Sequence, residues 1–187
     1  CDGYFVENCW CYQLYDTGVT HQCSKGDGNR TQENVRYLGN LIEYCHWGIE
    51  FYNSPETTTP YPNGSPYVRT TSDVHDAYNV VRNTGYGWGS VIKNRMIGSQ
   101  GYCGSSLSDN FDELTEYNIF DRSAGNLLFL PSNAKETQSR NIYIQYEGNY
   151  LGNLRGSHMR CDTDFAENIR KLWGDKEAVI VMIQKKD

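Results

Sequence analysis

Residues 141–147, Asn-Ile-Tyr-Ile-Gln-Tyr-Glu, are the stretch from which our expectation for the fold starts. Ile142, Ile144 and Tyr146 fall on one face of an extended chain, and the residues between them fall on the other. Such a period of two is typical of a half-buried β-strand. The stretch therefore predicts a strand with one face toward the core.

Helical patterns flank this strand in the sequence. Asp73 can cap a helix whose apolar residues fall at i, i+3, i+4 and i+7, namely Val74, Ala77, Tyr78 and Val81, with Gly85 just past its end. Asp164 can cap a second helix that carries Phe165, Ile169 and Leu172 and stops at Gly174. Residues 178–183 then predict a final buried strand.

The order of these elements indicates the fold class. Short β-type runs at residues 67–71 and 91–96 lie on either side of the first helix. Strands and helices mix without the regular alternation of a parallel βαβ sheet, and we find no internal repeat. The sequence therefore predicts a single α+β domain over residues 1–187.

Composition narrows the function classes. The chain has 187 residues, a net charge of −6 and 15 tyrosines, and 13% of its residues are aromatic. An acidic chain argues against binding to nucleic acid or to anionic lipid, because those partners need a surplus of Lys and Arg. Apolar runs are too short to span a membrane. Aromatic side chains can build the core instead of Leu and Ile.

Cysteines predict the compartment. Four of the seven cysteines lie in the first 23 residues. That clustering predicts a disulfide-stapled N-terminal segment over residues 1–34 and a secreted protein, with the pairing left open and one thiol over. A zinc site at Cys9, Cys11, His21 and Cys23 is disfavoured by the ligand spacing, so we expect no metal.

A hydroxyl-rich run precedes the first predicted helix. Residues 67–72, Tyr-Val-Arg-Thr-Thr-Ser, form an aromatic-led strand that ends in consecutive hydroxyls. This stretch resembles the second motif of the ADP-ribosylating toxins of the pertussis and cholera type. Gln145-Tyr146-Glu147 resembles the Gln-x-Glu form of that family's third motif. The resemblance covers about residues 35–183 and implies two packed, mainly antiparallel sheets with flanking helices.

The family also requires an early strand arginine. Val35-Arg36-Tyr37, followed by a short helix over residues 41–47 and by Gly48-Ile49, resembles that arrangement. The family's usual residues around the arginine are missing here. An alternative is one continuous amphipathic helix through Val35 and Ile42, which would place Arg36 on a solvated face.

The resemblance implies roles for these residues. Glu147 would be catalytic, stabilising the positive sugar that forms when nicotinamide leaves NAD, and Ser72 would orient it. Arg36, with Thr70, Thr71 and Ser72, would bind NAD, which is a co-substrate, and Gln145 would meet the acceptor. The implied function is transfer of ADP-ribose to a host protein, with NAD hydrolysis as a side activity and a possible delivery subunit.

Two rival hypotheses come from other classes. A non-enzymatic secreted effector or adhesin would bind a protein or glycan through a Tyr-rich surface, because aromatic side chains are favoured at interfaces. A secreted hydrolase would use carboxylates such as Asp109, Asp112 and Glu113, although no paired acid–base spacing stands out. Release of nicotinamide from NAD discriminates the transferase from the binder.

Overall fold

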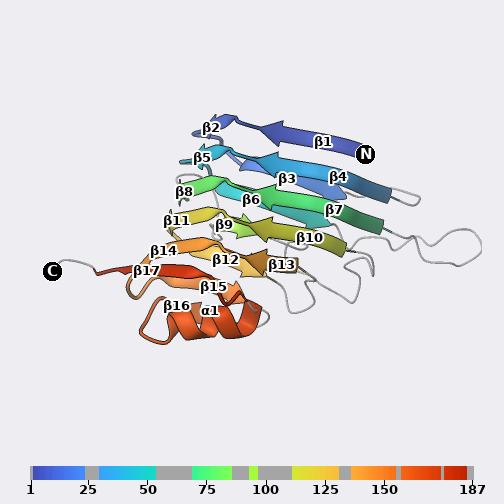
Figure 1. Cartoon of the computed structure of the whole chain (residues 1–187). Helices are drawn as coiled ribbons and strands as arrows, with labels where there is room; N and C mark the ends of the chain where they lie inside the picture. The colour runs from blue at the N-terminus through green and yellow to red at the C-terminus, as the bar shows by residue number, and fades with distance from the viewer. Residues whose placement is uncertain are drawn as a thin grey trace, which may run out of the picture.

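The chain winds into a solenoid of three parallel β-sheets, seen from the side in Figure 1. The computed structural model describes residues 2–23, 30–53, 69–85, 93–96, 111–130, 136–154, 157–173 and 175–184. Sheet A has the strand order β1-β4-β7-β10-β13, sheet B the order β17-β14-β11-β8-β5-β2, and sheet C the order β16-β15-β12-β9-β6-β3. Each turn of the solenoid, here called a coil, adds one strand to each sheet.

Five successive coils make up the solenoid. The strands of the coils, in order, are β1 (Asp2–Glu7), β2 (Trp10–Tyr12) and β3 (Thr17–Cys23); β4 (Arg30–Leu38), β5 (Leu41–Glu43) and β6 (Trp47–Asn53); β7 (Arg69–Ala77), β8 (Val80–Thr84) and β9 (Lys93–Met96); β10 (Phe111–Glu116), β11 (Ile119–Ser123) and β12 (Asn126–Leu130); β13 (Glu136–Ser139), β14 (Ile142–Tyr146) and β15 (Tyr150–Leu154). Coils therefore stack along one axis, about 4.8 Å apart.

The C-terminal elements depart from this repeat. Strand β16 (Ser157–Arg160) pairs antiparallel with β15. Helix α1 (Phe165–Trp173) lies at the lower end of the stack in Figure 1. Strand β17 (Val179–Ile183) then pairs parallel with β14. The predicted C-terminal helix and last strand are confirmed, but Val179 and Val181 of that strand are exposed.

The expectation of an α+β fold with antiparallel sheets is wrong, because the described elements are almost all strands in parallel sheets. The helix expected after Asp73 is the end of β7, a corner and β8. Val74 and Asp76 point inward before the corner, and Asn79 and Val81 point inward after it. Two strands separated by a short corner thus place buried residues at spacings that imitate a helix.

The same corner joins sheets A and B in every coil. Its first residue has a positive φ in each case: Asn8, Gly39, Tyr78, Tyr117 and Arg140. Its second residue is asparagine in the second to fifth coils, at Asn40, Asn79, Asn118 and Asn141, and Cys9 in the first. Our sequence analysis overlooked this repeat, although the asparagines at 40, 79 and 118 are evenly spaced; the spacing shortens between 118 and 141.

The asparagines form a continuous hydrogen-bonded ladder. The backbone N–H of Asn40 donates to Asn79 Oδ1, that of Asn79 to Asn118 Oδ1, and that of Asn118 to Asn141 Oδ1, each at 2.9 Å. Each Nδ2 donates to a backbone carbonyl of the preceding coil, those of Val6, Tyr37, Asp76 and Thr115. The ladder satisfies polar groups that the corner would otherwise bury without partners.

An apolar column lies behind the ladder. Ile42, Val81, Phe120 and Tyr143 occupy the same register position in sheet B and are fully buried. Phe120 and Tyr143 stack with their centroids 5.7 Å apart. The strand predicted over residues 141–147 is confirmed, and its buried face is the one that carries Tyr143 and Gln145. This column holds the coils together and makes the corner a rigid edge.

The disulfide-stapled segment expected over residues 1–34 is not found in the described part of that range. Residues 2–23 form the first coil of the same solenoid. Within the described part of the chain, Cys9, Cys11, Cys45 and Cys161 are free thiols. Burial raises the pKa of Cys161 to about 11 and raises the pKa values of Cys11 and Cys45. Burial in the core, rather than a covalent link, accounts for Cys45 and Cys161.

Candidate binding site

Arg36, the predicted NAD-binding arginine, lies on the outer face of β4. Its Nη2 contacts both carboxylate oxygens of Asp73 at 2.8 and 2.7 Å, and its Nη1 donates to the backbone carbonyl of Asp73. It is therefore a strand residue, not a helical one. Its forked donors are engaged with the neighbouring strand and do not face a pocket.

The other predicted nucleotide- and acceptor-binding residues are divided between two sheets. Ser72 lies in β7 and is partly buried; Thr70 and Thr71 lie in the same strand, and their side chains are outside the described residues. Gln145 lies in β14 and is fully buried, where its Nε2 donates to the carbonyls of Ser123 and Tyr150. Gln145 therefore fills the core and does not face an acceptor.

Glu147, the predicted catalytic residue, is exposed in the turn after β14. Its backbone N–H donates to the carbonyl of Ile183. Ser72 belongs to sheet A of the third coil, and Glu147 follows a strand of sheet B in the fifth coil. The two coil steps between these residues place them about 10 Å apart along the axis, before the separation between the two sheets is counted. The structure does not bring Arg36, Ser72 and Glu147 into one cleft.

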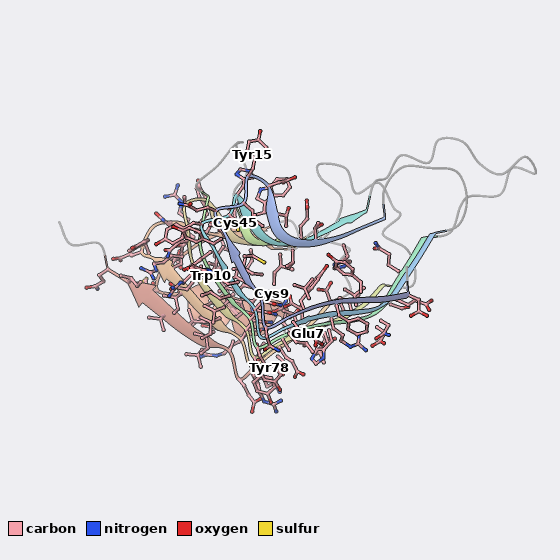
Figure 2. The ribbon with its side chains drawn as sticks, turned by 90° about the horizontal axis from the view of Figure 1, so that it is seen from above. Glu7, Cys9, Trp10, Tyr15, Cys45 and Tyr78 are labelled. Carbon is pink, nitrogen blue, oxygen red and sulfur yellow. The ribbon has the colours of Figure 1, made fainter. Side chains whose placement is uncertain are left out.

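The outside of the ladder corner carries a different constellation. Tyr78 and Tyr117 occupy the corner position of consecutive coils and project outward, as Figure 2 shows for Tyr78. Their rings stack with centroids 5.3 Å apart and an interplanar angle of 7°. Tyr78 is 60% exposed and Tyr117 is 40% exposed. We call the residues at this position, Asn8, Gly39, Tyr78, Tyr117 and Arg140, the corner column.

Arg140 anchors the lower end of the corner column. Its guanidinium carbon lies 5.5 Å from the centroid of Tyr117, and its Nη1 donates to the Tyr117 hydroxyl at 3.0 Å. Its Nε forms an ion pair with Glu177. The carboxylate of Glu177, and then Tyr117, raise the pKa of Arg140. This network holds the stacked rings in one orientation while leaving them exposed.

A polar hollow of about 340 Å³ borders the column below Arg140. Gln138, Ser139, Asp175, Lys176 and Glu177 line it. Asp175 is buried and ends the asparagine ladder, because its carboxylate accepts the backbone N–H groups of Arg140 and Asn141. The hollow therefore offers the Ser139 hydroxyl and the Lys176 ammonium beside Arg140, at the end of the column away from Tyr78.

Two further aromatic groups lie on the surface away from the corner column. Trp10 contacts Tyr12 on the outer side of sheet B, and its Nε1 donates to Glu43, which also pairs with Arg82. Tyr150, 42% exposed, lies 4.9 Å from the Arg160 guanidinium carbon at the other side of the coil. Neither group borders the hollow.

Our sequence analysis missed the corner column. The signal is present as an asparagine followed by two apolar or aromatic residues, in Asn40-Leu41-Ile42, Asn79-Val80-Val81, Asn118-Ile119-Phe120 and Asn141-Ile142-Tyr143. The residue before each asparagine is the exposed corner residue. Aligning the chain on these asparagines places Tyr78 above Tyr117.

Membrane-spanning helices and metal-binding clusters were also sought among the described residues. No helix there is long and apolar enough to cross a membrane. No group of three or more His, Cys, Asp or Glu side chains in the same part of the chain could hold a metal ion. The chain matches no protein-family model, no curated protein and no solved structure.

Proposed function

We propose that this protein is a non-catalytic binding module that holds a neutral glycan along its corner column. The observation that carries the proposal is the exposed, stacked pair Tyr78 and Tyr117, held in place by Arg140 and bordered by a polar hollow. The ring faces point along the solenoid axis, and the free face is that of Tyr78 on the side away from Tyr117, because Arg140 lies over the other face of Tyr117.

Sugar rings match both parts of this site, the exposed aromatic surface and the polar hollow. One face of a pyranose carries only C–H groups, whose partial positive charge is attracted to the negative face of an aromatic ring. Its hydroxyls need donors and acceptors, which the hollow supplies through Ser139 and Lys176. Binding sites commonly combine apolar surface with a few polar groups that fix orientation.

Charge favours a neutral sugar over an acidic one. The chain has a net charge of −6, and Arg140 is neutralised by its ion pair with Glu177. A polyanionic glycan would meet repulsion from the whole molecule without a compensating cationic patch at the column.

ADP-ribose transfer has less support than glycan binding. The transferase hypothesis requires Arg36, Ser72 and Glu147 in one cleft. Arg36 and Ser72 lie on neighbouring strands of sheet A, but Glu147 follows a strand of sheet B two coils beyond Ser72. A protein partner would also use exposed aromatics, but the hollow beside the rings is lined by polar side chains alone. We therefore make the transferase an outcome of the test.

Isothermal titration with cellohexaose, xylohexaose, mannohexaose and chitohexaose tests the proposal. We expect at least one to bind, and Tyr117→Asn to weaken it about tenfold, equivalent to about 1.4 kcal/mol. Asparagine tolerates the positive φ at this position, so the corner keeps its backbone.

Tyr150→Asn is the matched control, because Tyr150 is equally exposed and also faces an arginine, but lies away from the column. It should leave affinity unchanged. Equal loss in both variants, or no binding by the unmodified protein, would overturn the proposal. Release of nicotinamide from NAD that Glu147→Gln abolishes would support the transferase instead.

A further inference from the structure

The corner column has a position without a side chain, and it lies directly beside the exposed ring of Tyr78. Gly39 occupies the column in the second coil, between Asn8 of the first coil and Tyr78 of the third. Tyr78 stacks on Tyr117 on one side only. Because every other described coil places a side chain at this position, Gly39 leaves a gap of one coil step, about 4.8 Å.

The carboxamide of Asn8 forms the upper side of this gap. A Cβ built on Gly39 would lie 2.8 Å from Asn8 Oδ1 and 3.8 Å from Asn8 Cγ, and no other atom of the described residues would lie within 4 Å of it. The Asn8 side chain makes no hydrogen bond within the described part of the chain, although its backbone N–H donates to Leu38. The gap thus has an aromatic face on one side and an unengaged amide on the other.

We infer that the gap over Gly39 is a subsite for one neutral pyranose ring. The C–H face of the sugar would stack on Tyr78, and a hydroxyl on its other side would hydrogen-bond with the Asn8 carboxamide. The inference rests on the proposed glycan-binding function, and it deepens that function by naming the position at which one sugar residue stacks on the free face of Tyr78.

Glycine at position 39 is explained by the backbone and by the gap together. Its φ is +68°, a left-handed conformation that glycine and asparagine both adopt. The backbone alone would therefore allow asparagine. Asparagine would fill the space above Tyr78, and the one atom that it would crowd is the end of the Asn8 side chain, which can move.

The test fills or alters the gap without changing the corner backbone. Gly39→Asn should weaken binding of the best hexasaccharide about tenfold, and Asn8→Gly should weaken it several-fold by removing the amide. Tyr78→Phe should bind like the unmodified protein, whereas Tyr78→Asn should lose about tenfold. Thermal unfolding followed by circular dichroism checks that all four variants keep the fold.

Saturation-transfer NMR locates the ligand independently of affinity. With the unmodified protein, the sugar ring that receives the strongest transfer from aromatic protons should lose that transfer in Gly39→Asn. If the hexasaccharide binds, Tyr117→Asn weakens it and Gly39→Asn has no effect, this subsite is refuted while the proposed function stands. If no hexasaccharide binds the unmodified protein, the proposed function itself fails.

Discussion

Tyr78 and Asn79 are neighbours in the chain and have opposite environments. Asn79 is fully buried, and its side chain contacts Tyr37, Asp76 and Asn118. Tyr78 is 60% exposed and touches the next coil through ring stacking. The same contrast recurs at each corner from Gly39-Asn40 to Arg140-Asn141. The inner position must satisfy buried backbone groups and tolerates little change, whereas the outer position is free to carry binding residues.

Replacing the asparagine at the inner corner position should have the largest effect on stability. Asn118→Ala removes the acceptor of the Asn79 backbone N–H and the donor to the Asp76 carbonyl, and both groups stay buried. Each unsatisfied group costs about 1–3 kcal/mol, so we expect the free energy of unfolding to fall by about 3 kcal/mol. Urea unfolding followed by far-UV circular dichroism measures it. A loss below about 1 kcal/mol would contradict the structural importance of the ladder.

The rate of thiol alkylation should differ by orders of magnitude between an exposed and a buried cysteine. Burial raises the pKa of Cys161 to about 11, so at pH 8 only about one thiol in a thousand is ionised. Since only the thiolate reacts, Cys161 stays inert until the pH approaches 11 or the protein unfolds. Cys9 is exposed. Iodoacetamide labelling of the native protein at pH 8, read by peptide mass spectrometry, should modify Cys9 long before Cys161; equal rates would refute the buried core position.

Changing the outer position should have the smallest effect on stability. Tyr117→Asn loses the stacking on Tyr78 and the contact with Arg140, each worth about 1 kcal/mol at most at an exposed site. The same urea measurement should therefore show a loss of about 1 kcal/mol, well below that of Asn118→Ala. Equal losses at positions 117 and 118 would remove the distinction between a structural and a binding face.

The hydrophobic pattern of short stretches correctly predicted one strand and the C-terminal helix. The alternation in residues 141–147 marked β14, and the capped apolar stripe after Asp164 marked α1. The same reasoning failed over residues 73–85, where Val74 and Val81 belong to different strands. Buried residues alternate along each strand with a period of two, and the two-residue corner shifts this alternation between the strands. The combined spacing then resembles the period of 3.6 residues of a helix.

The candidate site was missed for a related reason. Ser72 and Glu147 were grouped because short motifs match in order, but a solenoid brings together residues one coil apart. Tyr78 and Tyr117 meet because Asn79 and Asn118 pair across the coils. Each tyrosine directly precedes one of the repeated asparagines, and that shared position is the signal that comparison within the chain would have found.

Taken alone, the amino-acid sequence determined which residues are buried at the corners: the asparagine after four of the five corner residues, and the second of the two apolar residues that follow each asparagine. Only the stacking of coils decided which outer residues become neighbours, and so placed Gly39 beside Tyr78 and the polar hollow beside Arg140. The physical reason is that hydrogen bonds between coils set the register, and register is a property of the assembled sheets.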